Sequence, residues 1–517
     1  MENITRRDFL KLMTAFSAGI TLSGSQPFVS RLLQNADGKP NIIIFLFDAM
    51  SAYNLSVYNY PRQTTPNLER FAQRATVYHS HYSGGNFTSP GTASMLTGLY
   101  PWNHRAFNAD SPIRREVVAN NLFRLAGEQY FRVGFSQNLL ADIFLRQFQE
   151  DLDIRLPAAS FVPKGSAPMP GDLFPGDSMV ASYSLDRFPF TNRGVKKNIP
   201  GSLLWGYLEM LLSDNESYSS DSKNYPYGLP HNGFASYQHP MLFGGIEALL
   251  RNLLKEEKPT LAYFHIFSPH FPYAPRKEFT EIFPPLQLPD LPRHPLASTD
   301  VSRKRTHSRR NLYDSFIADL DFEFGKMLDS LEQNKILDNS YVIVTSDHGE
   351  LFGRGETGHG SPLLYDPVIR IPLLISSPGQ AQRRDIYSLT SNTDLLPTIS
   401  NLAGQLAPGI TDGKALPGFG GMEDDSRSVY SMITTNTSAF TPPKTGSVCL
   451  IKGEYKLIYY FGYQNFPDQF EMYSLASDPE EEHDLYSSGL PEARHMKDEL
   501  LAALSSANAA MEQQGEG

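Results

Sequence analysis

The chain has little cysteine and no excess of positive charge, and both facts exclude classes of protein. Cys449 is the only cysteine among 517 residues, which excludes a disulfide framework and a CxxC-type metal site. Lys and Arg number 45 against 56 Asp and Glu. Because phosphate-backbone binding depends on clustered positive charge, we expect no nucleic-acid partner. An anionic substrate must be attracted by local features, such as a metal ion or helix N-termini, and not by the overall field.

Long hydrophobic runs are also absent. The short, weakly apolar stretch at residues 12–22 is too short for a standard membrane span, and no other segment could cross a bilayer. Just before it, Arg6 and Arg7 are followed by x-Phe-Leu-Lys, which resembles a twin-arginine export signal. The resemblance implies the twin-arginine export machinery as a partner and a periplasmic or extracytoplasmic location. The alternative is an ordinary basic helix packed on the fold. No A-x-A cleavage site is visible, so the segment could also remain attached as an uncleaved membrane anchor. We expect no other contact with a membrane.

Buried strands and amphipathic helices alternate along the chain. Residues 41–48 and 341–349 are continuous apolar runs that end in an acid, and residues 260–267 and 371–376 are weaker examples. Such unbroken runs are typical of strands that helices cover on both faces. Helices are predicted at 67–75, after Thr65 and Pro66, at 311–334 and from 393 to about 404. We therefore predict an α/β fold with a large, mostly parallel (mixed) central sheet sandwiched by helices.

The composition and residue pattern of the sequence suggest three parts. Residues 1–36 would be the export signal or anchor with a linker, residues 37–425 the catalytic α/β domain, and residues 426–517 a small α+β subdomain with an antiparallel sheet. The last rests on short strand-like runs at 447–451, 455–460 and 470–475, followed by a polar helix. Insertions at 151–240, with one helix near 203–212, and at 268–300 are rich in loop-forming residues. Such loops commonly shape substrate specificity.

Acidic and imidazole side chains follow the two strongest strand predictions. Asp48 ends the first apolar run, and Asp347 and His348 end the other. Since sites form outside the carboxyl ends of parallel strands, these groups could converge on one divalent metal ion. Each acid taken alone could also be only a helix cap or turn former.

Residues 86–98 read as a loop that enters a helix, with Ser89 near the N-cap and Pro90 at the first helical position. Thr88 would then lie in front of unsatisfied amides, which favour an alkoxide and an incoming phosphate or sulfate. A hydroxyl is a poor nucleophile unless a base or a metal ion activates it. The alternative is a capping role for Thr88 or Ser89.

Together, these segments resemble the sulfatase-like family of the alkaline phosphatase superfamily. The resemblance runs from about residue 40 to 490 and rests on many motifs in one order. They lie at residues 41–48, 65–72, 88–101, 346–350 with 358–360, 370–374 with 378–379, 394–399 with 412–413, 455–458, and 473–480. Single short motifs are weak, but agreement across so many is specific.

The resemblance implies roles for particular residues. Asp48, Thr88, Asp347 and His348 match the metal-ligand and nucleophile positions, while His270 and His359 match histidines that contact the transferred group or protonate the leaving group. It implies one divalent ion, with Zn or Mn favoured by the imidazole and Ca or Mg as alternatives. On its apolar run, His265 is predicted to be a packed core histidine.

The predicted reaction depends on the positions at which this sequence departs from the family pattern. Thr88 stands where sulfatases carry the cysteine that becomes formylglycine, Thr92 replaces a supporting arginine, and Ala49 replaces a second acid. Around residues 134–138 there is no lysine–histidine pair to hold sulfate. The pattern is closer to phosphoethanolamine and phosphoglycerol transferases, which form an intermediate on threonine.

We therefore predict a metal-dependent hydrolase, or a transferase, that acts on an anionic phosphate or sulfate ester through Thr88. Two alternatives remain at this stage. One is a sulfuric ester hydrolase that works without formylglycine, and the other is a non-catalytic anion-binding relative.

Overall fold

The computed structural model describes residues 38–163, 223–233, 235–253, 258–284, 286, 291–297, 301–406, 408–434 and 437–515. The predicted export signal, the helix near 203–212 and residues 164–222 of the first insertion therefore lie outside the described residues. Within the described ranges, no helix is both long enough and apolar enough to span a bilayer.

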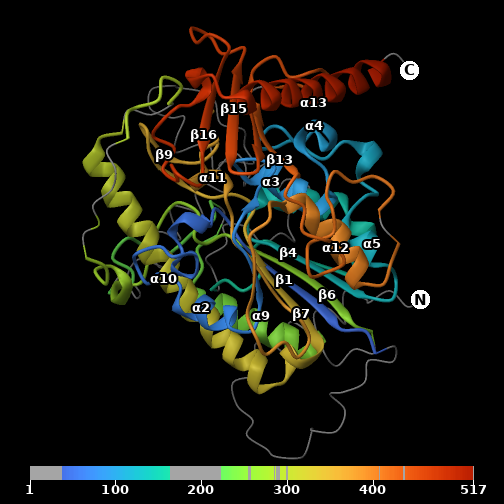
Figure 1. The fold of residues 1–517 in the computed structure, drawn as a ribbon. Helices are drawn as coiled ribbons and strands as arrows, with labels where there is room; N and C mark the ends of the chain where they lie inside the picture. Colours follow the sequence, from blue (N-terminus) through green and yellow to red (C-terminus); the bar gives the residue numbers. More distant parts are fainter. Residues whose placement is uncertain are drawn as a thin grey trace, which may run out of the picture.

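A mixed central sheet forms the core of the larger part of the molecule (Figure 1). In spatial order its strands are β11 (Arg384–Ile386), β2 (Thr76–Tyr78), β10 (Leu373–Ser376), β7 (Ser340–Thr345), β1 (Asn41–Phe47), β6 (Thr260–Ile266), β4 (Phe131–Ser136) and β5 (Ile154–Leu156). The run from β7 to β5 is parallel, and only β10 pairs antiparallel with both of its neighbours. The predicted mostly parallel, mixed sheet is confirmed.

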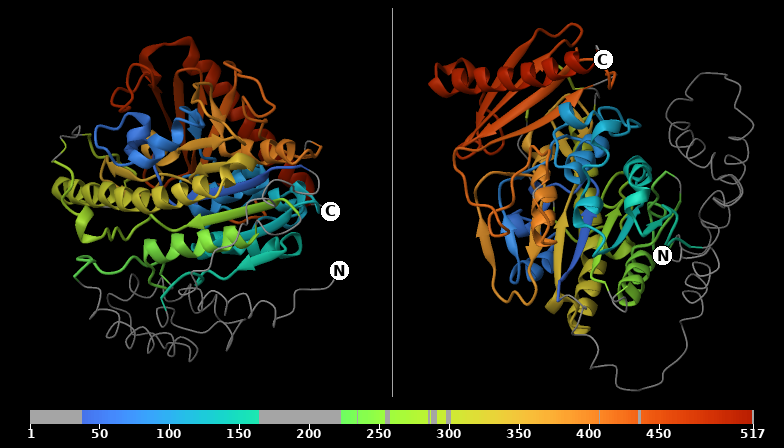
Figure 2. Two further views of the ribbon diagram at one scale, coloured as in Figure 1. Left: turned by 90° about the horizontal axis from the view of Figure 1, so that it is seen from below. Right: turned by 90° about the vertical axis from the view of Figure 1, so that its right-hand side faces the viewer.

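Helices cover both faces of this sheet because each central strand is apolar on both sides. Along β1, Ile43 and Phe45 face one hydrophobic core, whereas Ile42 and Ile44 face the other. The first face is covered by α2 (Pro66–Ala72), α9 (His239–Leu253) and α10 (Arg303–Gln333). The second is covered by α3 (Thr88–Thr97), α5 (Leu122–Ala126), α6 (Leu139–Gln147) and α12 (Leu395–Leu402). Figures 1 and 2 show the two helical layers on opposite sides of the strands.

A second, antiparallel sheet lies near the C-terminus, in the order β13 (Ser428–Thr434), β14 (Gly446–Lys452), β15 (Tyr455–Phe461) and β16 (Gln469–Ser474). One face packs on α13 (Pro491–Gly515), and the other packs on residues 351–369, which include α11 (Asp366–Ile369). Cys449 is buried in the latter core. The sheet and α13 are the uppermost elements in Figure 1, beyond the upper ends of the parallel strands.

Shorter elements complete the described chain. They are β3 (His81–Tyr82), β8 (Leu351–Gly353), β9 (Glu356–Gly358), β12 (Thr390–Ser391) and α4 (Pro101–His104), with 3-10 turns η1 (Ala52–Asn54), η2 (Ser56–Tyr58), η3 (Arg115–Val117), η4 (Gln149–Asp151), η5 (Lys277–Phe279), η6 (Ile336–Asn339), η7 (Asn392–Asp394) and η8 (Tyr486–Ser488).

Candidate active site

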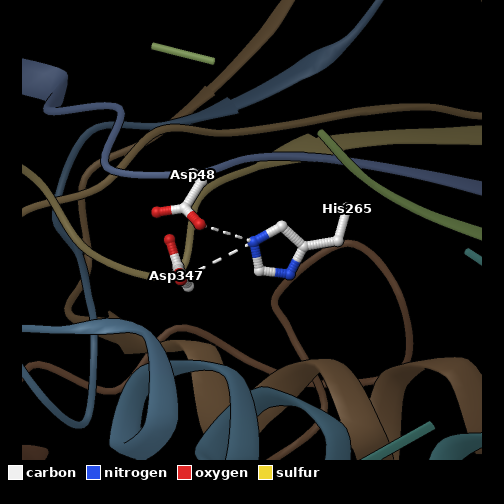
Figure 3. A group of neighbouring side chains, drawn as sticks. All are labelled: Asp48, His265 and Asp347. Carbon is white, nitrogen blue, oxygen red and sulfur yellow. Dashed lines mark hydrogen bonds and ion pairs between the residues drawn. The ribbon is translucent and has the colours of Figure 1, made fainter. Parts of the chain in front are cut away.

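Three strands of the central sheet bring side chains to one point. Asp48 follows β1, Asp347 follows β7, and His265 lies near the end of β6, the neighbour of β1 on its other side. His265 Nε2 lies 3.0 Å from Asp48 Oδ2 and 3.9 Å from Asp347 Oδ2, as Figure 3 shows. All three side chains are fully buried. Parallel strands therefore collect this cluster at their carboxyl ends, as expected for an α/β sheet.

Thr88 and His348 extend the cluster toward α3. His348 Nε2 lies 3.5 Å from Asp48 Oδ1, 3.7 Å from Asp347 Oδ2 and 3.5 Å from Thr88 Oγ1. Thr88 is the first residue of α3, and Phe87 is the N-cap. The predicted start, with Ser89 near the N-cap and Pro90 at the first position, was therefore wrong. The extended backbone of Phe87 leads directly into the helix, and Ser89 Oγ instead donates to the carbonyl of Ala109 (2.8 Å).

Both histidines present Nε2 to the acids, but their Nδ1 atoms have different partners. His348 Nδ1 lies 2.9 Å from the carbonyl of Gly349, which can only accept, so a neutral ring presents an unprotonated Nε2 to the carboxylates. His265 Nε2 faces the carboxylate of Asp48, so it carries the proton, and its Nδ1 lies 3.1 Å from the hydroxyl of Tyr263. Burial raises the pKa of Tyr263 well above its usual range, so this hydroxyl stays protonated and donates to Nδ1. A neutral His348 ring thus offers a lone pair to a cation, whereas His265 donates to Asp48.

Opposite charges govern ionisation within the cluster. Burial by itself would raise the pKa of Asp48, but the neighbouring imidazoles of His270, His265 and His348 hold that pKa well below its usual range. Burial would likewise lower the pKa of His348, but Asp347 and Asp48 raise it to about 9. The two carboxylates therefore create a strongly negative site that favours a cation beside His348.

The donor set fits a divalent metal ion. Asp48, His265 and Asp347 each offer a ligand atom, and these atoms lie within 4.8 Å of one another. In addition, Asp48 Oδ1 is buried without a hydrogen-bond partner among the described residues, an arrangement that leaves one carboxylate oxygen free for a cation. Carboxylates combined with imidazole suit Zn or Mn better than Ca or Mg.

Asn138 was missed by sequence reasoning. It follows β4 as the N-cap of α6, and its Oδ1 accepts from the backbone N–H of Leu140 (2.9 Å). This bond orients the amide group, so Nδ2 points at the site and donates to Asp48 Oδ2 (2.5 Å) and to Thr88 Oγ1 (3.1 Å). Because Asn is a common capping residue, no pattern in the sequence distinguishes this one.

His270 and His359 lie beside the cluster. The ring of His359 is 4.3 Å from that of His348 and 4.7 Å from that of His270, measured between centroids. His359 Nδ1 donates to Glu350, which also accepts from the hydroxyl of Tyr273 (2.5 Å). Burial lowers the pKa of His270. Two imidazoles thus border the space next to Thr88 and the acids.

The structure therefore brings together the six site residues that the sequence predicted: Asp48, Thr88, His270, Asp347, His348 and His359. His265 was predicted to be a packed core histidine, and the structure adds a polar contact to that burial. Its ring is fully buried, as a core residue would be, but it contacts Asp48. A buried polar ring needs a hydrogen-bond partner, but the sequence does not show which residue supplies it. Thr92, at the position of the missing arginine, donates to Asp347 Oδ2 (3.3 Å).

Known proteins share this fold and sequence pattern. The choline-sulfatase of Rhizobium meliloti is 23% identical over 399 residues, which cover 71% of this chain and 68% of that protein. An uncharacterized sulfatase of Escherichia coli, YidJ, is 22% identical over 468 residues, covering 86% and 83%. The crystal structure of the phosphonate monoester hydrolase of Agrobacterium radiobacter has a TM-score of 0.64 at 20% identity, covering 92% of this chain and 96% of that one.

The fold and these relatives define an ester hydrolase of the sulfatase type. The family model described as Sulfatase matches residues 40–151 and 190–405, and the model of the N-sulphoglucosamine sulphohydrolase C-terminal region matches residues 355–510. The chain belongs to the sulfatase family, within the alkaline phosphatase superfamily.

Proposed function

We propose that this sulfatase-family enzyme hydrolyses a phosphate ester, or less readily a sulfate ester, through a covalent intermediate on Thr88. The position of Thr88 Oγ1 carries the proposal, because it lies 3.1 Å from Asn138 Nδ2 and 3.5 Å from His348 Nε2 at the N-terminus of α3. There the helix dipole and donor groups favour a negative oxygen.

The reaction would run in two steps. Thr88 Oγ1 loses its proton and bonds to phosphorus or sulfur, while the ester bond breaks and the departing alcohol oxygen gains a proton. Water then cleaves the bond to Oγ1, Thr88 regains its proton, and free phosphate or sulfate leaves. His270 and His359 border this space, where imidazoles can hold the transferred group and deliver the proton to the leaving alcohol.

Asp48, Asp347 and His348, with Thr88 as the fourth ligand, would hold one divalent ion, and we favour His348 over His265 because its Nε2 lone pair faces the acids. Such an ion would act as a Lewis acid that lowers the pKa of the attacking hydroxyl. His265 would orient Asp48 by donating a hydrogen bond to its Oδ2, as groups around metal ligands commonly do.

Replacement of the nucleophile tests the proposal. For Thr88→Ala we expect turnover to fall by at least about 100-fold on every ester that the wild type cleaves, whereas Thr88→Ser should keep measurable activity. Ser89→Ala is the matched control, since Ser89 donates to Ala109 and not to the site. Intact mass of quenched enzyme should show a phosphorylated or sulfated chain only when residue 88 carries a hydroxyl. If Thr88→Ala kept more than a few per cent of wild-type turnover, the covalent mechanism would be wrong.

The names of the sulfatase relatives favour sulfate esters as substrates. The second candidate is therefore sulfate-ester hydrolysis, in which metal-bound water would attack directly. Matched phosphate monoesters, phosphodiesters and sulfate esters separate the two, since free phosphate and free sulfate are measured independently. A non-catalytic anion-binding protein would cleave none of them, and metal analysis would find no divalent ion bound or acquired.

We also propose export by the twin-arginine route, on the pattern at Arg6 and Arg7. Replacing both arginines with lysine should leave the protein in the cytoplasmic fraction of a bacterial host. Unchanged export would contradict the proposal.

A further inference from the structure

Arg105 occupies an unusual position directly after α4. Its backbone lies in the left-handed region, with φ at 67°, and its N–H donates to the carbonyl of Pro101 (2.9 Å). A left-handed residue at a helix end is usually glycine, because a side chain there is strained. Here the side chain is arginine, and it is only 1% exposed. An observed strain of this kind is a reason to look for a function.

Among the described residues, no acidic side chain pairs with the buried guanidinium group of Arg105. Its Nε and Nη1 atoms have no hydrogen-bond partner among the described residues. The ring of Phe107 lies 5.3 Å from the guanidinium carbon. Burial, followed by the nearby charge of Arg114, lowers the pKa of Arg105 to about 10, so the group is still charged at neutral pH. A buried charge without a partner is strongly unfavourable, and a second cation nearby increases that cost.

The loop that carries Arg105 makes hydrogen bonds both to α3, which begins with Thr88, and to Thr437, which follows β13. Ala109 accepts from Ser89 in the first turn of α3, and the Asn108 side chain exchanges hydrogen bonds with the backbone of Thr437 (2.8 and 3.3 Å). The loop closes where the N–H of Arg114 donates to the carbonyl of His104 (3.0 Å). A charge inside this loop therefore lies in a segment that borders the candidate active site without belonging to it.

We propose that Arg105 binds a small inorganic anion, chloride or a tetrahedral oxoanion, which neutralises its guanidinium and stabilises the loop at residues 105–114. Guanidinium N–H groups are strong donors to anions, and an anion would supply both the missing charge and the missing acceptors. This site goes beyond the proposed ester hydrolysis and does not depend on it.

Thermal unfolding of the full-length protein tests the proposal. Wild type, Arg105→Met and the control Arg115→Met, an exposed arginine in η3, would be compared in sodium gluconate, with chloride or sulfate replacing gluconate at constant ionic strength. We expect the Tm of the wild type and of Arg115→Met to rise saturably, by about 2–4 °C at a hundredfold excess over Kd. Arg105→Met should show no such rise. Anion binding at the catalytic groups contributes equally to all three proteins, so the difference reports Arg105.

An equal response of wild type and Arg105→Met would overturn the proposal. If Arg105→Met does not fold, Arg105→Lys keeps a cation with different donors and should raise the half-saturating anion concentration severalfold. An unchanged half-saturation point would again contradict the site. Bromide soaked into crystals supplies the direct readout, with an anomalous peak expected within hydrogen-bond reach of Arg105. If no anomalous peak appears there at bromide concentrations that shift Tm, the proposed anion site is wrong.

Discussion

At the scale of single residues, the site depends on side chains whose orientation is fixed by a second bond. Asn138 illustrates this, because its Oδ1 caps α6 while its Nδ2 reaches Thr88 and Asp48. His359 is similarly held through Glu350. Such fixed donors need no reorganisation during the reaction, which is the condition for effective electrostatic stabilisation.

Two substitutions separate the roles of Asn138. Asn138→Ala removes the cap and the donor, so we expect a loss of about 1 kcal/mol in stability and a fall of about 100-fold in kcat. Asn138→Asp keeps a good cap, so we expect little loss of stability from this source. It removes the donor and adds a charge beside Asp48, so kcat should fall at least as far as in Asn138→Ala. Steady-state kinetics and urea unfolding provide the measurements. Wild-type kcat in Asn138→Asp would show that the donor is unimportant.

At the scale of elements, the close approach of α3 to the end of β7 sets the distance between nucleophile and acids. Gly91 lies in the first turns of α3, and a Cβ built there would be 2.2 Å from the carbonyl oxygen of Asp347. Asn392 holds the same turn by donating to the carbonyl of Gly91 (2.9 Å). A side chain at position 91 would therefore push the helix away from Asp347.

Gly91→Ala should lower stability by about 1–3 kcal/mol, because backbone atoms must move, and should reduce kcat by more than about tenfold. Gly244→Ala is the matched control. Gly244 lies within α9 and is exposed, and a Cβ added there would meet no atom within 4 Å, so this change should stabilise by about 0.5–1 kcal/mol. Chemical unfolding and turnover measure both effects. Equal behaviour of the two variants would contradict the close-approach explanation.

At the scale of the whole molecule, a buried ionic group joins the C-terminal sheet to the catalytic part. Lys456 on β15 is fully buried and donates to Asp366 on α11 (2.8 Å) and to Glu481. Glu481 also accepts from the backbone N–H of Asp366 (2.8 Å). Burial raises the pKa of Glu481 to about 7, with Lys456 opposing the rise and Asp366 adding to it.

Removing the cation should make the stability more sensitive to pH. Because the folded pKa of Glu481 is raised, the folded state binds its proton more tightly than the unfolded state, so this group destabilises as pH rises from about 4.5 through 7. Lys456→Met leaves two buried acids without their cation, and we expect a loss of about 3–5 kcal/mol at pH 8 and a smaller loss at pH 5.

Urea unfolding at the two pH values checks this expectation. Lys414→Met is the control, because Lys414 forms an exposed, solvent-screened pair with Asp424 and should change the stability little at either pH. A loss in Lys456→Met that does not change with pH would refute the explanation.

The sequence by itself determined the strands and the chain positions of the chemistry. An unbroken apolar run must be buried on both faces, so Asp48 and Asp347 had to follow central strands and meet at one edge of the sheet. The small antiparallel sheet near the C-terminus also followed from local pattern, although β13 lacked a clear signal. Short-range periodicity does carry this information, because it reflects which faces of an element are buried.

Only the tertiary structure decided which side chains complete the site. The antiparallel direction of β10, the contact of His265 with Asp48 and the reach of Asn138 all depend on neighbours far away in the sequence. So does the burial of Arg105, which has no counter-ion in the described part of the chain. Distances between elements and the partners of buried polar groups arise from packing, and no local pattern of residues contains them.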